Sequence, residues 1–117
     1  MSLAAWIGLG LLGGLGAVAR VVLGAAVDAR AGSPFPWGTL VVNVMGALAL
    51  GVLVGAELGG DGYALAATGF LGAFTTFSTW VVDSRLLGAR LGGANVAVSL
   101  ALGLVAVWLG RELGALL

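Results

Sequence analysis

Residues 69–80 bring together side chains that could do chemistry inside a hydrophobic segment, in the order GFLGAFTTFSTW. The segment is apolar enough to cross a bilayer, yet these twelve positions include two glycines, three threonines and a serine, with aromatic residues between them. Small residues let backbones approach closely, and hydroxyl groups supply hydrogen bonds where water is scarce. We therefore expect the functional chemistry of the chain in this stretch.

The glycine and threonines of this stretch suggest a helix that breaks near its middle, because Gly72 is followed by Thr75 and Thr76. Non-helical backbone persists at membrane depth only if it is buried in protein or lines a cavity. A break frees carbonyl oxygens, which suit a hard cation such as Na⁺. It also exposes N–H groups, which suit an anion. The alternative is an unbroken helix whose hydroxyls bond back to the preceding turn. Spacing alone leaves both open.

The aromatic residues recur at helical spacing: Phe74, Phe77 and Trp80 are three apart. In a helix, such residues share a face. Simple packing would explain this stripe. Alternatively, the positive edges of the rings could seat a small anion.

Two further polar strips lie in neighbouring segments. Asn43 follows Thr39 by about one helical turn, and Ser99 follows Asn95 in the same way. An amide in hydrocarbon needs partners for its donors and its acceptor. Each strip therefore either bonds one helix to another or supplies donors to a passing anion.

Arg20 is a charged residue well inside the first hydrophobic segment. At the bilayer centre, an arginine facing lipid costs at least ~2.5 kcal/mol. Its side chain either reaches the interface, since Asp28 is only about two turns away, or faces a wet cavity that attracts anions.

The composition indicates an integral membrane protein. Of 117 residues, 61% are hydrophobic and 9% charged, whereas soluble domains carry about 25% charged residues. The net charge is zero and lysine is absent, which argues against nucleic-acid binding. The chain has no cysteine and no histidine, so it lacks the usual zinc ligands and the commonest general base. We therefore expect no enzyme.

The hydrophobic pattern predicts a single all-α membrane domain over residues 1–117. A helical span needs ~20 mostly apolar residues. Four windows qualify, at about residues 3–27, 36–56, 63–82 and 91–109. The first lacks the basic region of a cleaved signal peptide, so we expect it to be retained as a span.

The arginines between the spans are unevenly divided. Arg30, Arg85 and Arg90 follow the first and third spans, whereas Arg111 alone lies on the other side. The positive-inside rule weakly favours a cytoplasmic location for the side with three arginines. It is compatible with insertion in both orientations, or with one orientation and a separate partner.

Paired glycines could bring two helices together. Gly10 and Gly14, and also Gly51 and Gly55, have the GxxxG spacing. Such pairs serve either tight packing within one subunit or a dimer interface.

Three blocks of sequence resemble one family, the small fluoride channels called Fluc or CrcB. The blocks are GGLGAVAR at residues 13–20, GTLVVNVMG at 38–46 and GAFTTFSTW at 72–80, and the resemblance extends over essentially the whole chain. It implies a fluoride-specific channel for passive export of toxic cytoplasmic fluoride, located in the cell inner (plasma) membrane. It also implies an antiparallel, dual-topology dimer with two pores at its interface. The partner would be a second copy or an oppositely oriented homologous subunit.

The resemblance also implies roles for individual residues. Carbonyl oxygens of Gly72 and Thr75, from both subunits, would hold a structural Na⁺ on the dimer two-fold axis. The family's second pore phenylalanine corresponds to position 80, where this chain has Trp80. Spacing and resemblance together assign eight residues to a fluoride path: Arg20, Thr39, Asn43, Phe77, Ser78, Thr79, Trp80 and Ser99. Fluoride is small and strongly hydrated, so a pore must replace its water with several donors.

Two other functions compete with this one. A small multidrug exporter also has four short spans, but proton coupling to cationic drugs needs a carboxylate inside the membrane. The acidic residues here all fall at span ends or outside, at Asp28, Glu57, Asp61, Asp83 and Glu112. A membrane assembly protein would use its polar residues only to join helices, so Asn43→Ala and Thr75→Ala would leave ion flux intact.

Overall fold

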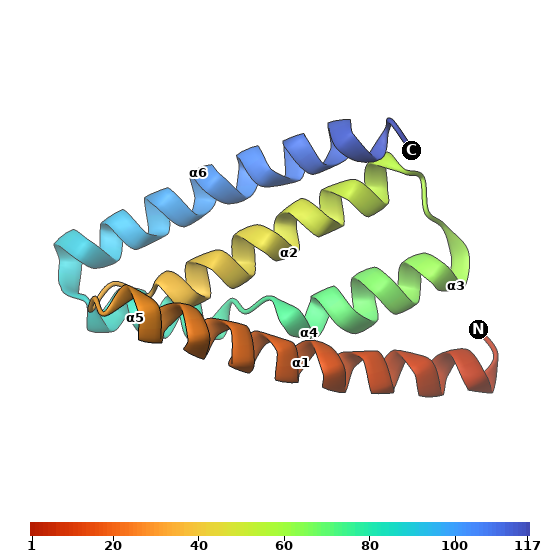
Figure 1. Ribbon diagram of the computed structural model, residues 1–117, viewed down its shortest axis with the longest axis horizontal. Coiled ribbons are helices and arrows are strands. Elements are labelled where there is room, and N and C mark those ends of the chain that lie inside the picture. The colour runs from red at the N-terminus through yellow and green to blue at the C-terminus, as the bar shows by residue number, and fades with distance from the viewer.

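The computed structural model describes residues 1–117, and all of its regular structure is helical (Figure 1). Four helical segments are long and apolar enough to cross a membrane, which confirms the prediction of an all-α, four-span chain. The third of them, Gly60–Leu86, is divided into several pieces. In chain order the elements are α1 (Leu3–Ala31), α2 (Trp37–Gly55), α3 (Gly60–Tyr63), η1 (Ala64–Leu71), α4 (Gly72–Phe74), α5 (Ser78–Leu86) and α6 (Gly88–Gly114).

Two of the helices extend well beyond the hydrophobic windows predicted for them. α1 continues to Ala31 rather than ending near residue 27, and α6 runs from Gly88 to Gly114 rather than over 91–109. The added turns carry Arg30, Arg90 and Arg111. Long charged side chains of this kind extend into the headgroup region, so hydropathy underestimates helix length.

Glycines make the tight connections at one end of the bundle. Gly32 ends α1 in the left-handed conformation (φ 57°), and its N–H donates to the carbonyl of Asp28. Gly88 has φ 85° and lets the chain pass almost directly from α5 into α6. Glycine adopts such positive φ values without steric cost.

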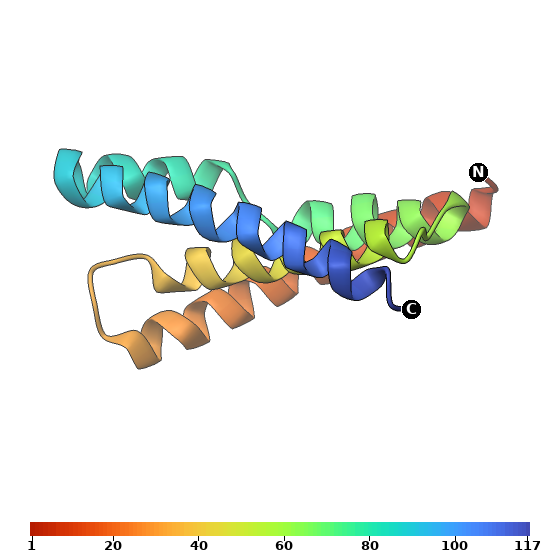
Figure 2. The same ribbon diagram turned by 90° about the horizontal axis from the view of Figure 1, so that it is seen from above.

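The helices form two close pairs. α2 packs along α6, and α1 packs along η1 and α4 (Figures 1 and 2). The first pair meets at small residues: a Cβ on Gly51 would collide with the carbonyl of Val107, and one on Gly110 with the carbonyl of Leu48. The close approach of the two backbones therefore requires glycine.

The two GxxxG pairs differ in their use. Gly51 and Gly55 both face α6 at contact distance, so this pair serves packing within the chain. Gly10 and Gly14 of α1 have nothing within 4 Å of the position a Cβ would take. They leave a smooth, exposed strip on α1.

The buried core is thin, as expected for a chain that covers its surface with lipid or partner protein. Val42 and Asn95 are the largest side chains that are fully buried, while large apolar residues are exposed along every long helix. An apolar groove of about 780 Å³ also separates α2 from η1.

The third span departs from a regular α-helix at two places. Its first half contains the π-helical segment η1, a rare geometry found mostly at functional sites. The helix then stops after Phe74 and resumes at Ser78, and Figure 2 shows the thin connecting segment between them. The predicted break near the middle of this span is confirmed.

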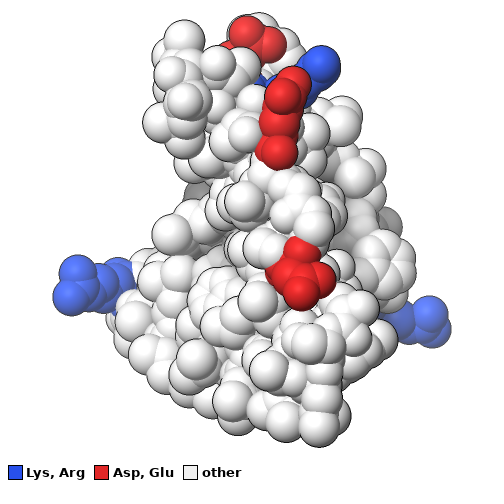
Figure 3. All heavy atoms as spheres, turned by 90° about the vertical axis from the view of Figure 1, so that its right-hand side faces the viewer, with Lys and Arg blue, Asp and Glu red and all other residues white.

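Charge differs between the two ends of the bundle. Figure 3 looks onto the end that carries both termini, where acidic side chains predominate. Glu57, Asp61 and Glu112 belong to this end together with Arg111. The other end holds most of the arginines.

Candidate functional site

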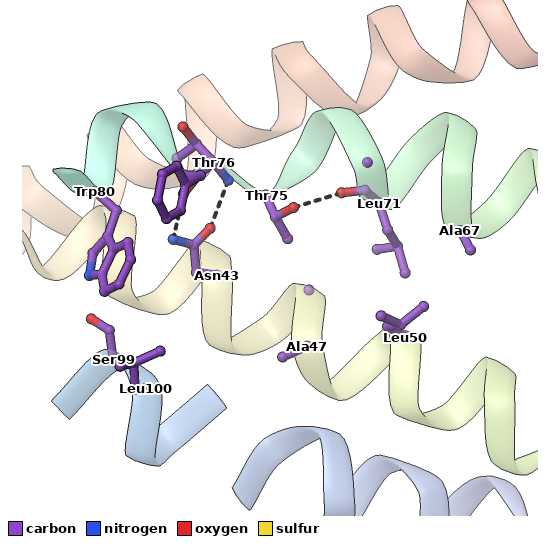
Figure 4. Close-up of a pocket in the computed structure, with 13 residues that line it drawn as sticks. Asn43, Ala47, Leu50, Ala67, Leu71, Thr75, Thr76, Trp80, Ser99 and Leu100 are labelled. Atoms are coloured by element: carbon purple, nitrogen blue, oxygen red, sulfur yellow. Dashed lines mark hydrogen bonds between the residues drawn. The ribbon is translucent and has the colours of Figure 1, made fainter. Parts of the chain in front are cut away.

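A groove of about 410 Å³ lies where the third span breaks, between α2, α5 and α6 (Figure 4). We call it the break groove. Its polar lining comes from Asn43, Thr75, Thr76, Trp80 and Ser99, and the rest of it is apolar or glycine. No acidic or basic side chain lines it.

Asn43 holds the break open by bonding to its backbone. Its Nδ2 donates to the carbonyl of Thr76 at 2.9 Å, and its Oδ1 accepts from the N–H of Thr76 at 2.8 Å. The amide thereby satisfies both main-chain groups of a residue that has left the helix. Of the two uses considered for Asn43, the interhelical bond is present. The amide still has a second N–H, and the side chain lines the groove.

The two threonines finish the helix halves on either side of the break. Thr75 donates through its hydroxyl to the carbonyl of Leu71 at 3.1 Å, which is the back-bonding considered as an alternative to a break. The Thr76 hydroxyl, one residue before the N-cap Phe77, accepts from the N–H of Thr79 at 3.2 Å and so pairs an N–H group in the first turn of α5. The break is therefore a defined structure with its own hydrogen bonds.

Gly46 leaves room on the surface of α2 for the break to pack against this helix. A Cβ at this position would collide with the side-chain methyl group of Thr75. Thr75 itself is extended, with φ −82° and ψ 160°. The extended residue therefore packs against α2 at a point where α2 has no side chain.

The carbonyl oxygens of Gly72 and Thr75 are among those at the break that accept no hydrogen bond from the chain. The N–H of Thr76, which would bond to the carbonyl of Gly72 in a continuous helix, donates to Asn43 instead. The carbonyl of Thr75 also has no donor. Gly72 and Thr75 are the residues predicted to hold Na⁺, and both line the groove.

The aromatic stripe divides into a buried and an exposed part. Phe74 is buried and stacks on Phe70, with ring centroids 5.7 Å apart. Phe77 is 73% exposed and meets Trp80 at 5.5 Å and an interplanar angle of 59°. Packing thus accounts for Phe74, whereas Phe77 and Trp80 present their rings to the groove.

A chain of side-chain hydrogen bonds connects α5 to α6. The Ser84 hydroxyl donates to the carbonyl of Trp80 at 2.7 Å, and Asn95 Nδ2 donates to Ser84 Oγ at 2.9 Å. The Ser99 hydroxyl donates to Asn95 Oδ1 at 3.3 Å. Asn95 is only 1% exposed. Ser84 was not among the predicted site residues, although a serine four residues after Trp80 in a helix is placed to bond to its carbonyl.

A second hollow, of about 300 Å³, lies between α1, α2 and the start of α5, and we call it the polar hollow. Arg20, Thr39 and Thr79 line it, and Thr76 lines both the hollow and the break groove. Arg20 Nε is buried and has no hydrogen-bond partner. Arg20 therefore faces a polar cavity, which is one of the two alternatives for this residue.

Two carboxylates at this end of the bundle bond to α2. Asp28 Oδ1 accepts from the N–H of Gly38 at 2.7 Å, and Asp83 Oδ2 accepts from the hydroxyl of Thr39 at 3.2 Å. Asp28 thereby supplies a partner to the N-terminal turn of a helix whose N-cap residue is Pro36. Asp28 also lines the polar hollow.

The structure thus distributes the predicted site residues over two neighbouring hollows. Asn43, Phe77, Trp80 and Ser99 meet at the break groove, together with the two predicted Na⁺ ligands. Arg20, Thr39 and Thr79 meet at the polar hollow. Ser78 lines neither.

The fold and the site define a class: small multi-pass membrane proteins in which a polar break opens one span. Residues 7–111 match the family described as CrcB-like protein, Camphor Resistance (CrcB). The chain belongs to this family.

Relatives of the chain carry a more specific name. It is 46% identical over 119 residues to fluoride-specific ion channel FluC 2 of Mycolicibacterium paratuberculosis, with 98% of each chain covered. Two relatives come from Symbiobacterium thermophilum. FluC 1 is 46% identical (93% of this chain and 96% of the relative), and FluC 2 is 51% identical (86% and 89%).

Proposed function

We propose that this chain is a subunit of a fluoride-specific ion channel that exports cytoplasmic fluoride passively. The observation that carries the proposal is the break groove itself. Asn43 holds a membrane-spanning helix open around a groove with hydrogen-bond donors but no ionised side chain. The names of the relatives point to the same ion.

The chemistry of the groove suits a small anion in transit. Fluoride needs several donors in place of its water, and Asn43, the hydroxyls and the ring edges of Phe77 and Trp80 can supply them. Because these donors are uncharged, they do not trap the ion as a fixed cation would. Arg20, in the adjoining polar hollow, attracts anions toward the break groove.

The pores would form at a dimer interface. The break groove is open on one side, and Phe77, at 73% exposure, is a large apolar side chain without cover. An antiparallel second subunit would cover both and complete two pores. That subunit is either another copy of the chain or an oppositely oriented homologue. Symbiobacterium thermophilum has two different relatives, FluC 1 and FluC 2.

The break could also hold a structural Na⁺ on the two-fold axis. Na⁺ prefers oxygen ligands, and the carbonyls of Gly72 and Thr75 are free to supply them. One chain offers two such oxygens, so two chains would offer four. The ion would stabilise the dimer and add positive potential near the anion path.

The chain lacks the acidic residue that a small multidrug exporter would need in the break groove. An acidic side chain for proton coupling is absent from the break groove, and the carboxylates of Asp28 and Asp83 already accept hydrogen bonds at one end of the bundle. The channel would be a multi-pass protein of the plasma membrane, where passive efflux of fluoride serves the cell.

Fluoride efflux from liposomes tests the function. Purified protein is reconstituted alone and with an opposed homologous subunit, and fluoride and chloride release are recorded with electrodes. We expect rapid fluoride release without chloride release. A folded dimer that releases no fluoride in either preparation contradicts the proposal.

A further inference from the structure

Trp80 carries a hydrogen-bond donor that the chain leaves unused. Its indole Nε1 is buried and has no partner, a condition shared among the buried side-chain atoms only by Arg20 Nε. A buried polar group without a partner is destabilising. Trp80 lines the break groove with its ring while Nε1 lies beneath the surface, so an acceptor in the groove would satisfy the indole after a small movement of the side chains around it.

Ser99 lies across the groove from this indole. Figure 4 shows the two side chains facing one another from α5 and α6. The Ser99 hydroxyl donates to Asn95 at 3.3 Å, whereas O–H···O bonds are usually about 2.7–2.8 Å long. A bond this long is weak, so the hydroxyl can turn and donate into the groove.

The surrounding hydrogen bonds hold the main chain of Trp80 and the amide of Asn95 in place. The carbonyl of Trp80 is bonded to Ser84, and Ser84 is bonded to Asn95, which is 1% exposed. Asn95 in turn bonds to Ser99. One hydrogen-bond network therefore links the two residues across the groove, while the weakly bonded Ser99 hydroxyl stays free to turn.

We propose that the Trp80 indole N–H and the Ser99 hydroxyl form a hydrogen-bonding subsite for fluoride in the break groove. The inference rests on the proposed function and names the atoms that would contact the ion. The hydrogen bond of an uncharged N–H to an ionised acceptor is about twice as strong as its bond to a neutral acceptor. Fluoride is the halide with the highest charge density, so this pair of donors favours it over chloride.

The nitrogen of Trp80 would add a hydrogen bond to the contact that its ring edge can make. An aromatic edge offers weak C–H contacts to an anion, whereas the indole N–H offers a directed hydrogen bond. A phenylalanine at this position could not make this bond.

The NMR resonance of the Trp80 indole N–H can report whether fluoride binds at this subsite. We would reconstitute ¹⁵N-labelled full-length protein in lipid nanodiscs and follow its indole N–H resonances in NaF and in NaCl, at equal Na⁺ concentration. The Trp80→Phe variant identifies the Trp80 resonance by its loss. We expect that resonance to move downfield in NaF and not in NaCl. Trp6, Trp37 and Trp108, which are exposed in the isolated chain, serve as internal references.

Efflux measurements test the same donors independently. In Trp80→Phe, the fluoride concentration that half-saturates efflux should rise about tenfold, since one hydrogen bond to a charged ion is lost. Ser99→Ala should raise it less and should reduce the shift of the Trp80 resonance. Trp108→Phe, a change on the exposed surface of α6, should alter neither measurement.

The outcomes separate this subsite from the channel function. Fluoride efflux with an unmoved Trp80 resonance overturns the subsite and leaves the channel intact, with water or protein then satisfying the indole. Equal movement in NaCl overturns the preference for fluoride. If neither efflux nor movement occurs, both proposals fail.

Discussion

α2 makes two contacts of opposite character within the same helix. Toward its C-terminal half, Gly51 and Gly55 bring its backbone against that of α6. Nearer its N-terminus, Asn43 and Gly46 receive the break in the third span. The glycine seam joins two continuous helices whose backbone groups are already paired. The break leaves backbone groups that need partners from outside the helix.

The comparison teaches how a small membrane protein combines rigidity with a polar path. The seam uses close packing, which needs no polar side chain. The break uses an amide and hydroxyls to satisfy most of its backbone, yet leaves the carbonyls of Gly72 and Thr75 free. The seam should therefore control folding, and the break should control ion passage.

The largest effect is expected from filling the seam. Gly51→Leu would drive a side chain into the Val107 carbonyl and the α6 backbone, with a cost of about 3 kcal/mol or more from overpacking. We expect loss of folded protein in thermal unfolding and in size-exclusion profiles. Gly103→Leu on α6 meets nothing within 4 Å and is the matched control. Equal stability of the two variants would contradict the role of the seam.

Removing the amide that holds the break should come next. Asn43→Ala leaves the N–H and carbonyl of Thr76 without their partners, at a cost of about 2–3 kcal/mol. We expect a lower unfolding temperature and fluoride efflux reduced at least about tenfold. Ala47→Ser, one turn further along the groove, is the control for a small change in lining. Unchanged efflux in Asn43→Ala would contradict the place of Asn43 in the fluoride path.

Replacing Na⁺ during purification addresses the two free carbonyls. If they hold the ion in a dimer, exchange for a large organic cation should destabilise the dimer by about 1–3 kcal/mol, following the usual dependence on ligand concentration. Dimer dissociation measured against protein concentration in each salt checks this. A dimer equally stable in both salts would remove the central ion from the proposal.

The smallest effect is expected at the cap of α5. Thr76→Val keeps the shape of the side chain but removes the hydroxyl that accepts from Thr79. Loss of a hydroxyl that pairs an N–H group in the first turn of a helix costs about 1 kcal/mol. We expect a small decrease in unfolding temperature and a modest change in efflux. Thr68→Val, a hydroxyl deletion within η1, serves for comparison. A collapse of folding in Thr76→Val would mean that the break depends on this cap far more than on Asn43.

Sequence patterns were informative where one residue type has few uses in a membrane. Four apolar windows predicted four spans because backbone groups in lipid must be paired within helices. Gly72 with Thr75 and Thr76 suggested the break, but their spacing alone also allowed an unbroken helix. The choice between the two uses of Asn43 was open, since an amide can bond to protein or to an ion. Its contact with Thr76 depends on how α2 lies against the break.

The sequence by itself determined that this chain is helical, crosses a membrane and places small and polar residues inside its third span, because composition and hydropathy are properties of each segment alone. The tertiary structure decided that this span breaks, since Asn43 of another helix pairs the backbone of Thr76. Only the tertiary structure decided which GxxxG pair forms the seam and which stays exposed. It also decided that Asn95 and Ser84 support Trp80, and that Arg20 faces a polar hollow. These outcomes depend on contacts between helices distant in sequence, and each residue type there is compatible with several such contacts.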